Sequence, residues 1–256
     1  MKLCLDVGNS QITVGLFDDE GLQAKFRKVI EGGASSDELG IFLRHSLREN
    51  GRDPSTVSAI AFCSVVPDVN HSLANACRRY FGIEPFVLKA GVKTGLRIRY
   101  ANPAEVGADR IAGAMAAVAR YPDSDLIIVD LGTATIVEAV SADRDYLGGA
   151  IAPGVGISMR TLEQSTAGLP PVEILRPEKV CGRSTVESIQ SGLYWGHLGM
   201  IRELRDRIAR ESFSAEKPFV IGTGRFAGLY ADRSLFDTVH PDLALEGLAL
   251  ALELNR

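Results

Sequence analysis

Residues 126–137 read LIIVDLGTATIV, in which an apolar run ends in an acid and a second apolar run follows a glycine and small hydroxyl residues. This pattern predicts a strand, a tight turn and another strand. Gly132 lets the backbone approach a ligand because it has no Cβ. Thr133 and Thr135 offer hydroxyls and backbone N–H groups to an anion. Alone, the pattern is also typical of an ordinary structural turn.

The beginning of the chain repeats this order, because residues 3–14 read LCLDVGNSQITV. Four pairs of positions correspond at one constant spacing: Asp6 and Asp130, Gly8 and Gly132, Asn9 and Thr133, Ile12 and Ile136. A structural turn needs no distant copy of itself, whereas a phosphate clamp built from two hairpins does. The internal repeat therefore favours a nucleotide site over a structural turn.

Composition narrows the function classes. The chain has 256 residues and a net charge of −4, without a basic run, so we expect neither a nucleic-acid nor a membrane partner. No apolar stretch approaches the roughly 20 residues of a membrane span, and the first residues already read as a strand where a signal peptide would be apolar. The scattered cysteines Cys4, Cys63, Cys77 and Cys181 are typical of reduced cytoplasmic thiols. The histidines have no metal-ligand spacing and are interpreted as structural or surface residues: His45, His71, His197 and His240.

Each half of the chain is predicted to follow the order βββαβαβα, with a long helix over residues 184–212 inserted in the second half. We expect one domain over residues 1–122 and another over 123–256, with a last helix that begins at Pro241. Alternating strands and helices predict α/β domains with mixed sheets flanked by helices. Two such halves with paired Asp-x-Gly hairpins resemble the duplicated actin- and ribonuclease-H-like domains of actin, sugar kinases and heat-shock chaperones. That resemblance implies an ATP cleft between the two domains.

A closer resemblance is to the type III pantothenate kinases, over essentially the whole chain. Its motifs occur in the family's order: a first phosphate motif at residues 6–10, a pantothenate motif at 107–110, a second phosphate motif at 130–134, Gly148-Gly149 and Pro153-Gly154. Ser10 stands where the family usually has Thr, and Arg225 where it usually has a second Gly. The resemblance implies ATP-dependent phosphorylation of pantothenate to 4'-phosphopantothenate, the first step of coenzyme A biosynthesis.

In this interpretation the first hairpin wraps the ATP phosphates and Thr133 donates from the other side. The nucleotide-binding residues are expected to be Asp6, Val7, Gly8, Asn9, Ser10, Gln11, Ile12 and Thr13, with backbone N–H groups near Gly8 as donors. Asp6 would hold hydrated Mg²⁺, although it could also simply form the turn. By resemblance, Asp130 would hold the potassium or ammonium ion that the family needs for ATP binding.

The resemblance makes Asp109 the catalytic base that accepts the proton of the pantothenate hydroxyl; the alternative is a plain helix N-cap. Arg110 would bind an oxyanion or pair with Asp109. The substrate contacts implied by the family are Tyr100, Gly107, Ala108, Asp109, Arg110 and Thr185. For Tyr100, the alternative is a role in packing alone. Resemblance and the long helix also predict a homodimer with pantothenate near the subunit seam, and Leu193, Trp195 and Leu198 serve either packing or that seam.

Three other functions fit parts of the sequence. Residues 222–227 match G-x-G-x-x-A after a strand, as in dinucleotide-binding enzymes, but Asp242 follows Pro241 at a helix start and too little chain remains for that unit. A polyphosphate phosphatase of the same superfamily would share the hairpins without needing residues 107–110. A nucleotide-binding accessory or regulatory protein without catalysis is the third. The absence of a Walker A segment excludes a P-loop kinase.

Overall fold

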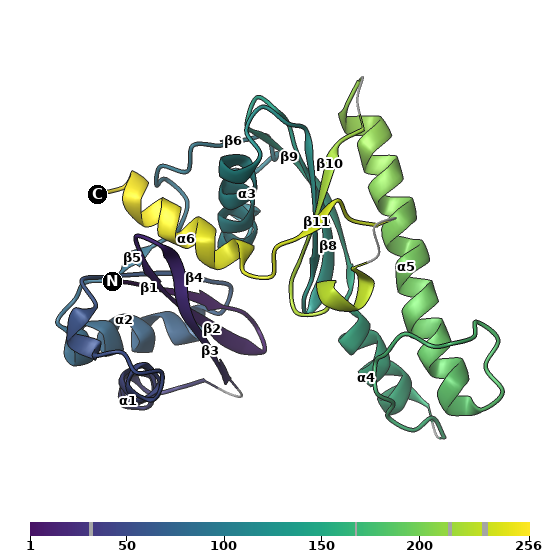
Figure 1. Ribbon diagram of the computed structural model, residues 1–256, viewed down its shortest axis with the longest axis horizontal. Coiled ribbons are helices and arrows are strands. Elements are labelled where there is room, and N and C mark those ends of the chain that lie inside the picture. The colour runs from purple at the N-terminus through teal and green to yellow at the C-terminus, as the bar shows by residue number, and fades with distance from the viewer. Residues whose placement is uncertain (31–32, 167, 215–216, 232–234) are drawn as a thin grey trace. The chain divides into compact units, whose positions relative to one another are not determined.

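The computed structural model describes residues 1–30, 33–166, 168–214, 217–231 and 235–256. Contacts within the chain divide it into two compact units (Figure 1). Unit 1 comprises Met1–Leu96, Ala101–Ala116 and Leu243–Arg256, and unit 2 comprises Arg97–Tyr100 and Ala117–Asp242. Each unit therefore contains chain from both halves of the sequence. The division of the chain into one domain over residues 1–122 and another over 123–256 stays a prediction.

Unit 1 is built on a five-stranded sheet with the order β3-β2-β1-β4-β5. Its antiparallel part consists of β1 (Lys2–Val7), β2 (Gln11–Asp18) and β3 (Gly21–Val29), while β4 (Ala59–Ser64) and β5 (Phe86–Val87) extend the sheet parallel to β1. The central strand β1 is almost entirely buried, as expected for a strand covered on both faces. Asp6 is the acidic residue that interrupts this apolar strand, near its carboxyl end.

Helices α1 (Ser36–Glu49) and α2 (Pro67–Phe81) cover one face of this sheet (Figure 1). Local signals define their ends. The Ser35 hydroxyl accepts a hydrogen bond from the Glu38 N–H at 3.1 Å, and Gly82 ends α2 in the left-handed conformation with φ of 68°. The short helix η1 (Pro54–Thr56) leads into β4. These helices contribute leucines to one hydrophobic core with the sheet.

The other face of the unit 1 sheet carries α6 (Leu243–Leu254), which in turn packs on α3 (Ala108–Arg120), just after η2 (Pro103–Glu105). The helix predicted to start at Pro241 begins two residues later, because Pro241 and Asp242 form a turn. The end of α6 is held by an ion pair between Lys2 and Glu253 and by two hydrogen bonds between Asn255 and the backbone of Lys93. The C-terminal helix is thus an integral part of unit 1.

Unit 2 repeats this sheet. Its strands β7 (Leu126–Leu131), β8 (Ala134–Val140), β9 (Asp145–Pro153), β10 (Phe219–Thr223) and β11 (Thr238–Val239) have the order β11-β10-β7-β8-β9. β7, β8 and β9 are antiparallel, and β10 and β11 run parallel to β7. The second hairpin therefore occupies the same place in its sheet as the first, which confirms the predicted duplicated α/β architecture.

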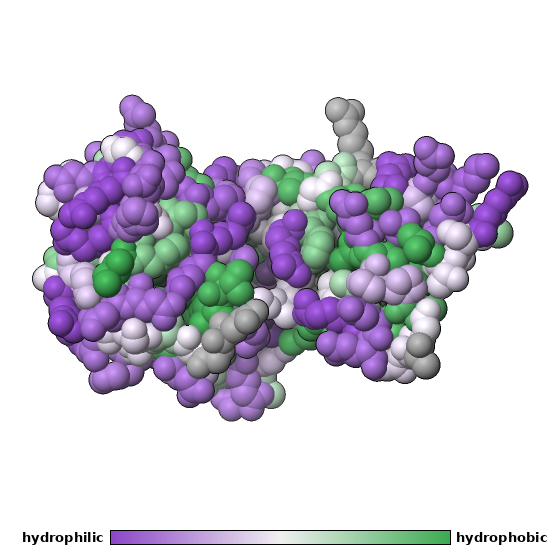
Figure 2. Space-filling view, turned by 90° about the horizontal axis from the view of Figure 1, so that it is seen from below, coloured by the Kyte–Doolittle hydropathy of each residue, from purple (hydrophilic) through white to green (hydrophobic). Residues whose placement is uncertain are grey.

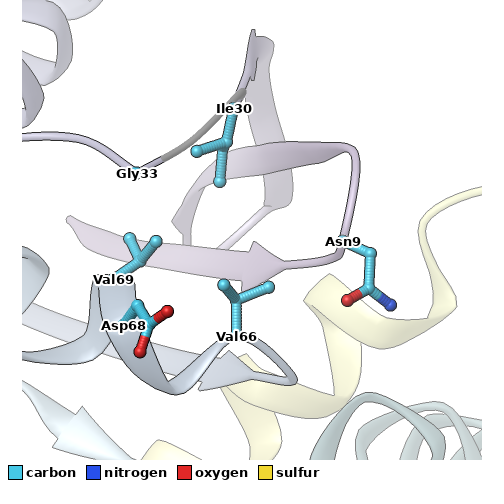
Figure 3. A pocket seen from close by; sticks show the side chains of 6 residues that line it. All are labelled: Asn9, Ile30, Gly33, Val66, Asp68 and Val69. Atoms are coloured by element: carbon cyan, nitrogen blue, oxygen red, sulfur yellow. The ribbon is translucent and has the colours of Figure 1, made fainter.

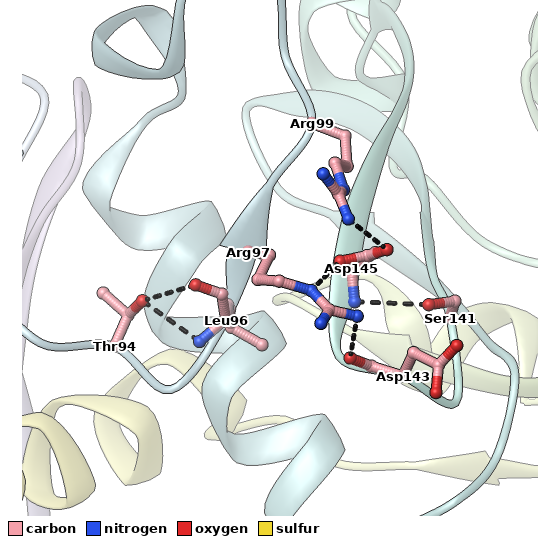
Figure 4. A network of polar contacts seen from close by, with 7 residues as sticks. All are labelled: Thr94, Leu96, Arg97, Arg99, Ser141, Asp143 and Asp145. Carbon is pink, nitrogen blue, oxygen red and sulfur yellow. Dashed lines mark hydrogen bonds and ion pairs between the residues drawn. The ribbon is translucent and has the colours of Figure 1, made fainter.

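A sixth strand, β6 (Arg97–Ile98), pairs with β9 at the edge of the unit 2 sheet. Figure 4 shows how its arginines hold it there. Asp145 accepts from Arg97 Nε at 2.5 Å and from Arg99 at 3.1 Å, and Arg97 also donates to the carbonyl oxygen of Asp143 at 3.0 Å. The hydrogen bond from Arg97, supplemented by Arg99, lowers the pKa of Asp145. The clamp fixes the backbone just before Tyr100.

The long helix α5 (Thr185–Ser212) lies along one face of the unit 2 sheet, beside α4 (Val155–Ser165) (Figure 1). Leu193 and Leu198 are 4% and 2% exposed, and Trp195 packs at the edge of the core that contains Leu198. Leu193 belongs to a smaller core with Val155 of α4. These residues therefore serve the packing of their own unit. The homodimer stays a prediction. Among the described residues of unit 2, the large hydrophobic side chains that stay exposed are Ile151, Leu162, Val180 and Val186.

On the face drawn in Figure 2 hydrophilic residues predominate, and hydrophobic ones form separate patches between them. Within the described residues, no helix has both the length and the apolar character needed to cross a membrane.

Candidate active site

The first phosphate motif forms the turn between β1 and β2. The Gly8 N–H donates to the Gln11 carbonyl at 3.0 Å, and the Ile30 N–H donates to the Ser10 carbonyl at 3.2 Å, which ties the turn to the end of β3. Val7 and Ile12 are 0% and 1% exposed, so they can meet a nucleotide only through their backbone. The other predicted nucleotide residues, Gln11 and Thr13, are half-buried and joined by a side-chain hydrogen bond of 3.3 Å.

The two hairpins differ in turn length, which corrects the constant spacing expected from the sequence. Residues 8–11 separate the paired Val7 and Ile12, but only residues 132–134 separate Leu131 from Thr135. Asp130 therefore pairs with Ile136, whereas Asp6 pairs with Thr13. Ile12 corresponds to Thr135, not to Ile136, because the second turn is one residue shorter. Thr135 is 2% exposed, so the hydroxyl expected to meet an anion lies inside the sheet.

Asp6 lies in an acidic environment within unit 1. Burial and, to a smaller extent, the nearby charge of Asp109 raise its pKa to about 6, and a hydrogen bond from Cys63 partly offsets this rise. The Cys63 thiol donates to Asp6 Oδ1 at 3.4 Å. Burial also raises the pKa of Cys63 well above its ordinary value, so this side chain stays a protonated donor. The fold thus brings the predicted Mg²⁺ ligand and the predicted base close enough to interact electrostatically.

Asp109 is the second residue of α3, so it is not the N-cap that the alternative interpretation required. Its carboxylate accepts from the Arg110 N–H at 2.9 Å and lies over Gly107, where an added Cβ would come within 2.4 Å of Asp109 Oδ1. The carboxylate therefore accepts a hydrogen bond from one backbone N–H of the first turn of α3, as acidic residues in the first turn of a helix commonly do. Gly107 makes room for it, and Ala108 begins the helix.

In unit 2, the Asp130 carboxylate is enclosed by two glycine turns. An added Cβ at Gly132 would lie 3.4 Å from Asp130 Oδ1, and one at Gly224 only 2.2 Å from it. Gly224 also has a φ of 84°, which disfavours other residues. The Phe226 N–H donates to the Leu131 carbonyl at 3.0 Å and fixes the turn after β10 against the hairpin. The two glycines therefore leave the space beside the Asp130 carboxylate free of side-chain atoms.

Gly154 brings a third turn to the same hairpin. A Cβ there would lie 2.3 Å from the carbonyl oxygen of Thr133 and 2.8 Å from that of Gly132. The neighbouring Pro153 carbonyl is 3.1 Å from Nε2 of His197, a buried residue, which agrees with a structural role for this histidine. Thr133 itself is half-buried at the tip of the hairpin.

Arg225 stands beside this cluster of turns. Its guanidinium lies 4.5 Å from the centroid of the Phe226 ring, and a Cβ at Gly156 would come within 3.0 Å of it. Burial and the charge of Arg160 lower the pKa of Arg225. Sequence reasoning identified Arg225 as a departure from the family pattern, and the structure places it at the start of α4.

Tyr100 follows β6 and packs beside Tyr146, with ring centroids 6.2 Å apart. The Tyr146 hydroxyl donates to Glu138, and both residues are buried at 0% and 2% exposure. Gly148, with a φ of 120°, approaches the Tyr100 ring so that a Cβ would lie 3.2 Å from it. Sequence reasoning missed the buried pair of Glu138 and Tyr146, which the antiparallel pairing of the consecutive strands β8 and β9 brings together.

Thr185 is exposed at the first position of α5, next to the N-cap Ser184. Among the described residues, its side chain takes part in no hydrogen bond. Helix α5 starts as a capping box, in which Ser184 accepts from the Glu187 N–H and Glu187 accepts from the Arg183 N–H.

A cavity of about 250 Å³ lies beside the first phosphate turn (Figure 3). It is lined by Asn9 of that turn, Ile30, Gly33, the α2 N-cap residue Val66, and Asp68 and Val69 of the first turn of α2. In Figure 3 Ile30 lies on one side of it and the two valines on the other. Within the described part of the chain, no three His, Cys, Asp or Glu side chains gather into a metal cluster.

The structure does not support the dinucleotide-binding alternative. The glycine turn after β10 leads into η3 (Ala227–Tyr230), a single short 3₁₀ turn, where a dinucleotide site needs the N-terminus of a long helix. The two-residue strand β11 follows, and Asp242 belongs to the turn before α6.

Solved structures share this fold at low identity. A putative Baf family transcriptional activator from Campylobacter jejuni has a TM-score of 0.59 at 16% identity, with 98% of this chain and 97% of that chain covered. A putative 2-dehydro-3-deoxygalactonokinase from Sinorhizobium meliloti has a TM-score of 0.56 at 13% identity, with 99% and 96% covered. Such likeness shows the fold alone.

Sequence relatives are much closer. A type III pantothenate kinase of Legionella pneumophila (strain Corby) is 52% identical over 255 residues, covering 100% of this chain and 99% of that protein. One of Elusimicrobium minutum is 47% identical, with 100% and 99% covered, and one of Francisella tularensis subsp. holarctica (strain LVS) is 40% identical, with both chains covered completely. Residues 2–207 match the sequence profile described as type III pantothenate kinase. The chain belongs to the type III pantothenate kinase family.

Proposed function

We propose that this protein transfers the γ-phosphoryl group of ATP to the hydroxyl of pantothenate and so makes 4'-phosphopantothenate, which opens coenzyme A biosynthesis. The observation that carries this proposal is the electrostatic interaction between Asp6, at the end of β1 just before the first phosphate turn, and Asp109, at the start of α3. Membership of the type III pantothenate kinase family supports the same reaction.

Asp109 is proposed as the group that accepts the proton of the attacking hydroxyl. Phosphoryl transfer depends mainly on positioning and charge neutralisation, and one carboxylate suffices to orient the nucleophile. The hydrogen bond from the Arg110 N–H holds one oxygen of Asp109 and leaves the other for the substrate. Gly107 supports this role, because a side chain there would occupy the space of the carboxylate.

The donor groups in unit 1 fit Mg²⁺ held by Asp6. The mutual repulsion of Asp6 and Asp109 favours a cation, and Mg²⁺ in kinases is typically bound through one or two carboxylates, phosphates and water. When bound, the ion would neutralise charge on the phosphates. The N–H groups of residues 8–10 would meet the phosphate oxygens from the backbone.

The enclosed carboxylate of Asp130 in unit 2 fits a monovalent cation. The carboxylate lies where Gly132 and Gly224 keep the backbone close, and an anion near phosphates needs a cation to offset the repulsion. Potassium or ammonium is therefore proposed at Asp130, with Thr133 as the phosphate donor of the second hairpin. A cleft for ATP between the two domains stays a prediction.

Pantothenate is an anion, and its proposed contacts are Tyr100, Gly107, Ala108, Arg110 and Thr185. A homodimer is proposed as well, with pantothenate near the seam. The exposed hydrophobic side chains of unit 2 and the exposed position of Thr185 support it, because both are available to a second subunit. Light scattering of the active protein tests the homodimer, and an active monomer would overturn it.

The reaction is tested by coupled detection of ADP with and without pantothenate, each with and without potassium. We expect ADP formation that depends on pantothenate and is stimulated by potassium. If sugars or polyphosphate stimulate turnover and pantothenate does not, the proposed function is wrong.

A further inference from the structure

A buried thiol contacts the carboxylate of the first phosphate motif. Cys63 lies on β4, directly beside Asp6 in the parallel register between β1 and β4, and is 0% exposed. Its Sγ is 3.4 Å from Asp6 Oδ1 and donates to it. The two strands come from distant parts of the sequence, so only the fold creates this contact.

The chemistry of the donor suits a carboxylate that must bind a cation. Among the described residues, Cys63 supplies the side-chain hydrogen bond to Asp6, and no lysine or arginine forms an ion pair with it. A lysine or arginine would orient Asp6 but would also cancel its charge. A thiol is a weak and neutral donor, so it can fix one carboxylate oxygen while the negative charge remains available.

We propose that Cys63 is a positioning residue, which holds Oδ1 of Asp6 and thereby orients the carboxylate for the cation that accompanies ATP. This inference rests on the proposed role of Asp6. Groups that hydrogen-bond to metal ligands commonly contribute 10- to 100-fold to metal affinity. Because a thiol donates weakly, we expect about a 3- to 10-fold effect here.

The protein contains a matched control for the loss of a sulfur atom. Cys4 lies on β1, two residues before Asp6, and is also 0% exposed. It pairs with Ala61 of β4, and its thiol has no hydrogen bond within the described part of the chain. Cys4→Ala therefore removes the same atom from the same sheet without removing a donor from Asp6.

The experiment compares Cys63→Ala, Cys63→Val, Cys63→Ser and Cys4→Ala by two measurements. The first is the Mg²⁺ concentration that gives half of the thermal stabilisation by a non-hydrolysable ATP analogue, and the second is kcat with pantothenate. Cys63→Ala and Cys63→Val should raise the half-maximal Mg²⁺ concentration, whereas Cys63→Ser, which keeps a donor, should restore it. Cys4→Ala should lower the melting temperature but leave the Mg²⁺ dependence unchanged.

The inference is overturned if Cys63→Val keeps the wild-type Mg²⁺ dependence, or if Cys4→Ala shifts it as much as Cys63→Ala does. Asp6→Asn separates this failure from that of the proposed function. If Asp6→Asn shifts the Mg²⁺ dependence and the Cys63 variants do not, only the role of Cys63 is wrong. If Asp6→Asn does not shift it either, the assignment of Mg²⁺ to Asp6 is wrong as well.

Discussion

Gly247 of α6 and Ala112 of α3 touch so closely that a Cβ on Gly247 would lie 1.8 Å from the carbonyl oxygen of Ala112. Both helices belong to unit 1, and α6 rests on the sheet that carries Asp6. The contact therefore sets how near α3, and with it Asp109, comes to β1.

The first prediction is that Gly247→Ala destabilises the protein by roughly 1–3 kcal/mol, because the two helices must move apart. Gly113→Ala is the matched control, since a Cβ there meets only Leu243 Cδ2, at 3.9 Å. Alanine favours a helix over glycine by about 1 kcal/mol, so Gly113→Ala should be neutral or stabilising. Denaturant unfolding measures both. Equal stability of the two variants would show that the close contact is unimportant.

The second prediction is that Asp109→Asn separates binding from chemistry. Asparagine is nearly isosteric and can still accept from the Arg110 N–H, so the start of α3 should persist. It cannot accept the hydroxyl proton, so kcat should fall by roughly 10²- to 10⁴-fold, the usual contribution of a positioned base.

ATP should still raise the melting temperature of Asp109→Asn, at least as much as in the wild type, because a negative charge near the phosphates has gone. A stable, nucleotide-binding variant with a wild-type kcat would show that Asp109 only accepts a hydrogen bond in the first turn of α3. The base would then have to be sought elsewhere.

The third prediction concerns the stability of the metal-free protein against pH. Folding raises the pKa of Asp6 from 3.8 to about 6, so the folded state binds this proton more tightly than the unfolded state does. The contribution of Asp6 to the free energy of unfolding is therefore most favourable below pH 3.8. It falls as the pH rises from 3.8 to about 6 and is constant at higher pH.

Asp6→Asn abolishes this titration. Without Mg²⁺ and nucleotide, the variant should be more stable than the wild type at about pH 8, by roughly 2–3 kcal/mol from the size of the pKa difference. The advantage should shrink toward about pH 4. Unfolding curves across this range measure it, and an advantage that does not depend on pH would contradict the titration of Asp6.

The fourth prediction is that Asp130→Ala raises the potassium concentration needed for turnover or abolishes activity. An acid near phosphates requires a cation to offset like-charge repulsion. ADP formation at graded potassium concentrations, with sodium chloride at constant ionic strength, measures this dependence. Wild-type activity without any potassium would remove the basis for assigning the ion to Asp130.

The fifth prediction distinguishes substrate binding from packing at Tyr100. Gly148→Ala would press on the Tyr100 ring at 3.2 Å, so we expect a several-fold higher KM for pantothenate with a smaller change in kcat. Gly21→Ala is the control, because its φ of 109° is equally unfavourable but nothing lies within 4 Å of the added Cβ. If the two variants share the same KM, Tyr100 serves packing alone.

Much of the fold could be predicted because its signals are local. The apolar runs around Asp6 and Asp130 defined two central strands, and the long helix predicted over residues 184–212 is confirmed as α5. The repeated Asp-x-Gly pattern predicted a duplicated architecture. The structure confirms it, because both hairpins occupy the same place in their sheets.

What the sequence could not predict depends on long-range pairing. The place of β6 at the edge of the second sheet is fixed by Asp145, which lies far along the chain. The structural counterpart of Ile12 is Thr135 and not Ile136, because the turn of the second hairpin is one residue shorter. A comparison at constant sequence spacing cannot detect such a shortened turn. Cys63 meets Asp6 only through the register of two parallel strands.

The return of α6 to unit 1 has a consequence for biosynthesis. A ribosome that has made residues 1–242 has made all of unit 2 but not the helix that covers one face of the first sheet. Domains usually fold from the N-terminus during synthesis, yet here the earlier sheet has to wait for the last helix to leave the ribosome. A messenger truncated by only a few codons would therefore yield a protein whose defect lies in its first-made half.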